Sequence, residues 1–100
     1  MVAELAKQAI KIKCGFENAK MTGNYECAYA LGIISKEAGI SLKEDFVNIV
    51  ELREYIENNI KDYTPNNDKI KRLIEMLSDY ETTDVFDEQM KILYNDGYNN

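Results

Sequence analysis

The chain has 100 residues, with 12 Lys and Arg against 18 Asp and Glu, a formal net charge of −6, two Cys, one Pro and no His. Apolar residues make up 45% and charged residues 30%, a balance typical of a soluble globular domain and a poor fit to a disordered or fibrous chain. The absence of His excludes Ser-His-Asp and Cys-His catalysis and every His metal ligand. We therefore expect one small domain over residues 1–100 that is not an enzyme and holds no metal or cofactor.

The first segment carries apolar residues at helical spacing, at Val2, Leu5, Ala9, Ile12 and Phe16. Residues 9–16 also alternate with a period of two, which is typical of a strand, so helix and strand both stay open there. The helix is preferred because no second β-rich segment could pair with a strand. Neither a secretory signal nor an apolar run of membrane-spanning length is present, which predicts a cytoplasmic protein.

Residues 24–38 predict the next helix, with Asn24 as its N-cap after a turn and Gly39 at its end. Small side chains at positions 28, 30 and 32 would let a neighbouring backbone approach closely, so we expect this helix to be the central element. Cys14 and Cys27 form no CxxC pair and are interpreted as small buried side chains. A disulfide between them is a less favoured alternative.

Residues 41–44, Ser-Leu-Lys-Glu, match the capping box that opens helices. This motif predicts a long helix from Ser41, with Phe46, Ile49 and Ile56 turned inward. Residues 33–41 also resemble the first helix and turn of a helix-turn-helix unit. Acidic residues follow directly at 44, 45 and 51, and these would repel DNA phosphates, so DNA binding is the least favoured of our hypotheses.

Residues 62–67 predict a loop, with Thr64 as the cap of a following helix and Pro65 as its first residue. That helix carries an apolar stripe from Ile70 to Tyr80, and residues 81–83 interrupt it. A short last helix over residues 84–94 ends near Gly97, and residues 98–100 are expected to fray. The predicted fold is all-α, a compact bundle of four longer helices plus a short C-terminal helix.

Charge is unevenly distributed along the chain, because residues 1–40 carry a net charge of +1 and residues 41–100 carry −7. The densest acidic stretch has no Lys or Arg between Arg72 and Lys91. Seven Tyr, with no Trp, add a residue type that is enriched in protein interfaces. The predicted partner-binding residues are Asp79, Tyr80, Glu81, Asp84, Asp87, Glu88 and Tyr94.

Ordinary helix chemistry offers a second interpretation of the same acids. Asp84, Asp87 and Glu88 share one face of a helical start, where carboxylates favour the positive end of the helix dipole. Such a triad could hold a hard cation weakly, but no calcium-binding loop accompanies it, so no metal site is predicted.

Three functions remain open. The first is a small acidic inhibitor or immunity-type protein, from a phage or a toxin–immunity system, that covers a basic site on a toxin or nucleic-acid enzyme. The first alternative is a helical adaptor or a homo-oligomeric structural protein, with a homodimer as one form. The second alternative is a helix-turn-helix-like DNA-binding regulator. Direct nucleic-acid binding and membrane binding are not expected under the first hypothesis.

Overall fold

The computed structural model describes residues 22–83 and 88–99. Within these ranges the chain forms α2 (Thr22–Ala38), α3 (Ile49–Asn59), α4 (Asp68–Met76), the 3-10 turn η1 (Leu77–Asp79) and α5 (Glu88–Asn99). The described residues are mostly helical and include no strand, which confirms the all-α prediction. The predicted helix over residues 2–16, its strand alternative and Cys14 fall outside the described residues.

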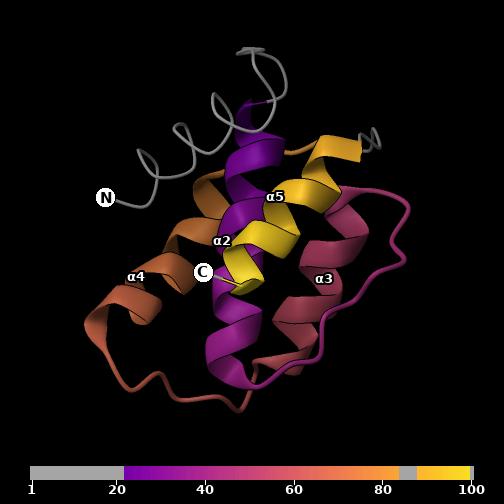
Figure 1. Cartoon of the computed structure of the whole chain (residues 1–100). Coiled ribbons are helices and arrows are strands. Elements are labelled where there is room, and N and C mark those ends of the chain that lie inside the picture. Colours follow the sequence, from indigo (N-terminus) through magenta and orange to yellow (C-terminus); the bar gives the residue numbers. More distant parts are fainter. Residues whose placement is uncertain (1–21, 84–87, 100) are drawn as a thin grey trace.

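Helix α2 runs through the middle of the molecule, with α3 and α4 on opposite sides and α5 packed across it (Figure 1). Every residue from Cys27 to Ser35 is buried, as expected for a helix that is covered all round. The predicted central position of this helix is therefore confirmed. Its predicted start is wrong, because α2 begins at Thr22 and Asn24 lies buried within the first turn instead of capping it.

Helix α2 ends as its sequence predicts, at Gly39. This glycine has a φ of +74°, a left-handed conformation that other residues adopt at a cost. The Gly39 N–H donates to the Lys36 carbonyl at 3.3 Å, and the Ile40 N–H donates to the Ser35 carbonyl at 2.9 Å. These two bonds form a Schellman motif, which satisfies carbonyls that the end of the helix leaves open.

The capping-box prediction at Ser41 is wrong, because residues 41–46 form no helix. The Lys43 N–H donates to the Tyr94 hydroxyl at 3.0 Å, and the Phe46 ring meets the Tyr94 ring edge-on with centroids 5.9 Å apart. Both contacts are made while residues 43–46 lie against α5 in a non-helical conformation. The tertiary contacts with Tyr94 therefore outweigh the local capping motif, which would stabilise a helix by about 1 kcal/mol.

Helix α3 instead begins at Ile49, where the Asn48 side chain caps it by accepting from the Glu51 N–H at 2.9 Å. Residues 39–48 thus separate α2 from α3. A helix-turn-helix unit joins its two helices by a turn of about three or four residues. Residues 33–41 therefore resemble a helix-turn-helix unit in the sequence of the turn, but the second helix does not follow at the distance that such a unit requires.

The difference between the two caps can be measured. We expect Asn48→Ala to lower the free energy of unfolding by about 1 kcal/mol, since it removes the cap of α3. Ser41→Ala should change it by less than about 0.5 kcal/mol, because Ser41 is exposed and precedes no helix. Urea denaturation of the two variants gives both values, and an equal loss in the two would contradict this assignment.

The second half of the chain also differs from its predicted boundaries. Asn67, and not Thr64, caps α4 by accepting from the Ile70 N–H at 2.9 Å, so Pro65 lies before the helix. The predicted break at residues 81–83 is confirmed. Helix α5 is not short, since it spans 12 residues and continues through Gly97 to Asn99. The helix thus ends two residues beyond the expected end near Gly97.

Candidate binding surfaces

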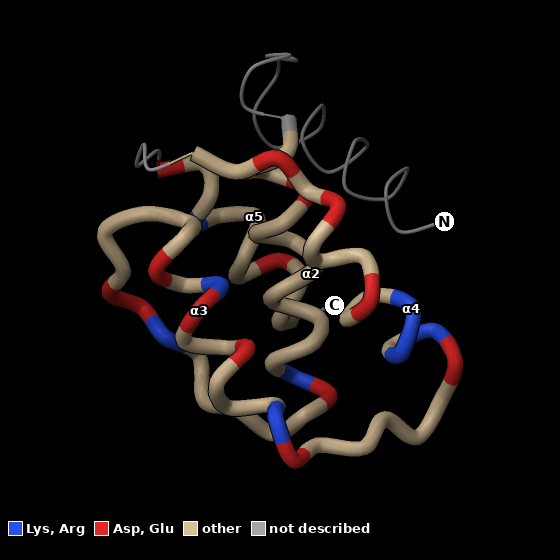
Figure 2. The backbone as a smooth tube through the Cα atoms, turned by 180° about the vertical axis from the view of Figure 1, so that it is seen from behind, with Lys and Arg blue, Asp and Glu red and all other residues tan. Residues whose placement is uncertain are grey.

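Figure 2 shows acidic backbone positions along the whole described chain, and several of them lie at the end of the molecule where α2 begins. We call this surface the acidic end and define it by Glu26 on α2, Asp79 on η1, Glu81 in the following segment and Glu88 at the start of α5. The last three are exposed, and Glu26 is partly exposed. No ion pair with another described residue is recorded for Asp79, Glu81 or Glu88, so their charges face solvent.

The acidic end is fixed to α2 by a pair of hydrogen bonds at Asn24. The Thr83 N–H donates to Asn24 Oδ1 at 2.9 Å, and Asn24 Nδ2 donates to Thr83 Oγ1, also at 2.9 Å. Nearby, the Gly23 backbone packs directly on the Glu81 carbonyl, where a Cβ would not fit. The hydrogen bonds of Asn24 and the packing of Gly23 therefore hold the segment that carries Glu81 in one position against α2.

Tyr80 is part of the support of this surface and not of the surface itself. Its side chain is only 9% exposed, and its hydroxyl has no hydrogen-bond partner among the described residues. Burial raises the pKa of Tyr80 to about 12, and the negative charges of Glu26 and Asp79 add to that shift. The carboxylates of the acidic end therefore act on the Tyr80 hydroxyl beneath them.

The structure divides the predicted partner-binding residues into three groups. Asp79, Glu81 and Glu88 are exposed and share the acidic end, whereas Asp84 and Asp87 lie outside the described residues. Tyr80 and Tyr94 are buried, at 9% and 1% exposure, so neither can present its ring to a partner. Tyr94 faces residues 43–46 in the core. Among the described residues, no group of His, Cys, Asp or Glu is arranged to hold a metal ion.

A pocket of about 480 Å³ opens between α3, the loop over residues 60–65, α4 and η1. Its apolar lining includes Ile60, Ile74 and Leu77. Its charged lining comprises Arg53, Glu57, Lys61, Lys71 and Glu75. The pocket thus combines an apolar wall with three cations and two carboxylates, although the whole chain is acidic.

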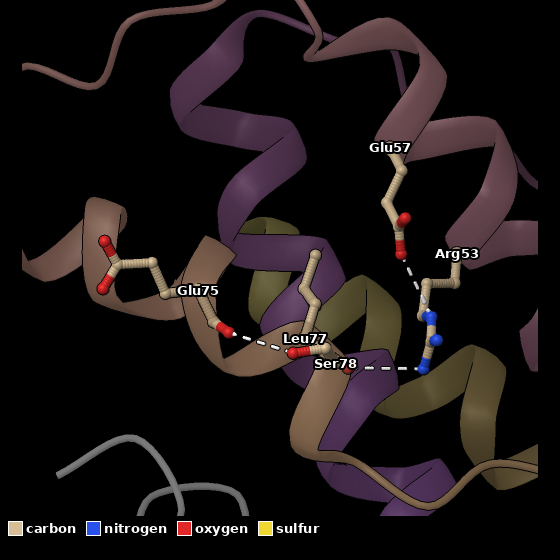
Figure 3. Close-up of polar contacts among 5 residues, drawn as sticks. All are labelled: Arg53, Glu57, Glu75, Leu77 and Ser78. Atoms are coloured by element: carbon tan, nitrogen blue, oxygen red, sulfur yellow. Dashed lines mark hydrogen bonds and ion pairs between the residues drawn. The ribbon is translucent and has the colours of Figure 1, made fainter.

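Arg53 bridges the two sides of this pocket, reaching from α3 toward η1 in Figure 3. Its Nε lies 3.0 Å from Glu57 Oε1, and its Nη1 donates to the Leu77 carbonyl at 3.2 Å. The guanidinium also lies beside the Cys27 thiol. Burial raises the pKa of Cys27 to about 12 and Arg53 opposes the shift, so this free cysteine remains an inert thiol at neutral pH.

Comparison with known protein families matches residues 1–100, the whole chain, to the Domain of unknown function (DUF3837). The chain belongs to the DUF3837 family. No curated protein and no solved structure matches it.

Two further surface properties of this DUF3837 chain bear on its partners. Large apolar side chains that are exposed among the described residues are Val47, Tyr55 and Ile92, which lie on separate elements or loops. None of the described helices has the length and apolar character needed to cross a membrane.

The sequence predicted three residues of the acidic end, Asp79, Glu81 and Glu88, but neither Glu26 nor the pocket. The three predicted acids lie close together in the sequence, so their density is visible without a structure. The pocket residues are spread from Arg53 to Ser78 over three elements and form no motif. Lys61, in the loop after α3, and Lys71, on α4, come to one opening only in the folded chain.

Proposed function

We propose that this protein is a binding module whose acidic end covers a basic surface on a partner protein, as an inhibitor or immunity-type protein does. It acts by binding and not by catalysis. The cytoplasm is the proposed location, since a buried free thiol such as Cys27 suits a reducing compartment. The partner expected from this chemistry is a toxin or a nucleic-acid enzyme with a cationic site.

The observation that carries the proposal is a set of exposed carboxylates beside a segment that is held against α2. Asp79, Glu81 and Glu88 are exposed and have no recorded counter-ion among the described residues. The contacts of Asn24 and Gly23 restrict the segment beside them. Charges that are already in place attract a cationic site during the encounter and lose little conformational entropy on binding.

The two alternatives have less support. An adaptor or homo-oligomer needs a continuous apolar surface, whereas the described residues expose only the scattered Val47, Tyr55 and Ile92. A DNA-binding regulator needs a recognition helix directly after the turn at Gly39, and residues 41–46 are not helical.

The test compares two variants that change the net charge equally. In the first, D79N/E81Q/E88Q, three carboxylates of the acidic end are neutralised. In the matched control, E37Q/E54Q/D62N, three exposed carboxylates elsewhere are neutralised. The partner is isolated with the tagged full-length chain, identified by mass spectrometry and produced separately, and its affinity is measured by calorimetry.

We expect the first variant to bind about tenfold more weakly at low salt, because it removes three charges from the contact, and the control to bind like the parent chain. Raising the salt from about 50 mM to about 500 mM should weaken parental binding strongly and the first variant less. An acidic partner, or equal losses in both variants, would show that the acidic end is not the binding surface.

A further inference from the structure

We propose that the pocket between α3 and α4 binds a small organic monoanion, such as a carboxylate carried on a short aliphatic or aromatic body. This site is separate from the acidic end and goes beyond the proposed function. Its volume of about 480 Å³ lies within the range of about 300–1,000 Å³ that is usual for small-molecule sites.

The apolar wall of the pocket defines the body of the ligand. Ile60 and Leu77 are nearly buried beneath the opening, and Ile74 is partly exposed beside them. Tyr63 and Pro65, which add flat surfaces on the loop side, are also partly exposed. An aliphatic chain or a single aromatic ring would cover this apolar surface, which water covers when the pocket is empty.

The charges around the opening define the head group. Glu57 is paired with Arg53, so these two lining charges cancel. Lys61 and Lys71 have no ion pair recorded with any described residue, and both are exposed. Their ammonium groups are therefore available as donors, and the remaining carboxylate, Glu75, balances only one of them.

The same balance of charge in the pocket favours a ligand with one negative charge over a ligand with two. A carboxylate can accept from the two lysine ammonium groups and leaves the pocket close to neutral. A dianion such as a phosphate monoester would add a second negative charge close to Glu57 and Glu75, and the repulsion would offset the gain.

Three probes with the same apolar body test the proposal on the full-length chain. Octanoate, octylamine and octanol carry a negative, a positive and no charge, and binding is measured by calorimetry and by amide chemical shifts. We expect octanoate to bind at least about tenfold more tightly than octylamine or octanol, with shifts concentrated in residues 53–78. Equal affinity for all three probes, no binding of octanoate, or shifts centred elsewhere would overturn the proposal.

A pair of lysine variants provides the matched control. K61A/K71A should weaken octanoate binding about tenfold, since it removes two charge-assisted hydrogen bonds. K36A/K69A has the same net charge but changes two exposed lysines outside the pocket, and it should bind octanoate like the parent chain. Equal affinity in the two variants would overturn the assignment of the head-group site. Neither result depends on the acidic end, so the two proposals fail independently.

Discussion

Replacing Gly97 with Ala is expected to lower the free energy of unfolding by about 2–4 kcal/mol, although Ala is by itself the better helix former. A Cβ at position 97 would collide with the Tyr29 carbonyl oxygen and lie 3.2 Å from the Ile33 nitrogen, both in the backbone of α2. Backbone atoms within a packed helix cannot move aside as the end of a side chain can. The two helices must therefore separate to admit one methyl group.

The same contact is seen from the other helix at Gly32. A Cβ at this position would collide with the Tyr94 carbonyl oxygen and lie 2.7 Å from the Tyr98 nitrogen on α5. Gly32 and Gly97 thus face each other's helices and allow α2 and α5 to pack backbone against backbone. Because α5 packs more extensively against α2 than any other element does, separating this pair loosens the largest part of the described core.

Urea denaturation followed by circular dichroism measures the effect of Gly97→Ala. Asn58→Ala is the matched control, since Asn58 is exposed on α3 and gains helix propensity without a new contact. The control should be unchanged or more stable by up to about 0.5 kcal/mol. If Gly97→Ala were as stable as the parent chain, the close approach of the two helices would be wrong.

Gly97 also shows why sequence reasoning located helices better than it located their ends. A glycine near the end of a helical pattern usually marks a C-cap, and Gly39 does so. Gly97 has the same local sequence signal but serves a tertiary contact in the middle of a helical turn. The two roles differ only in what packs against the glycine. The residues next to the glycine in the sequence do not indicate which element that will be.

The start of α3 illustrates the same limit. The Ser-Leu-Lys-Glu motif at residues 41–44 is a sound local signal, but Tyr94, which is far away in sequence, holds the Lys43 N–H and the Phe46 ring. Asp79, Glu81 and Glu88 were predicted as one cluster because they are close in sequence, whereas Glu26 joins the acidic end only through the fold. The burial of Tyr80 and Tyr94 was not predicted. A tyrosine ring has an apolar body and a polar hydroxyl, so its residue type alone does not decide between the core and the surface.

Replacing Asn24 with Ala is expected to lower the free energy of unfolding by about 2–3 kcal/mol, because it removes two hydrogen bonds of a fully buried side chain. The Thr83 N–H would lose its acceptor, and a small void would remain in the first turn of α2. Hydrogen exchange should report the change locally. We expect faster exchange of the Thr83 amide and a smaller change in exchange rate toward the C-terminal half of α2.

This substitution also separates the position of the acidic end from its charge, since Asn24→Ala leaves the net charge unchanged. If Asp79 and Glu81 bind the partner because they are held in place, the variant should weaken partner binding while keeping its salt dependence. Asn48→Ala, which removes the cap of α3 and none of the hydrogen bonds between Asn24 and Thr83, is the control and should bind like the parent chain. Unchanged binding by Asn24→Ala would mean that charge alone, without the fixed backbone, accounts for recognition.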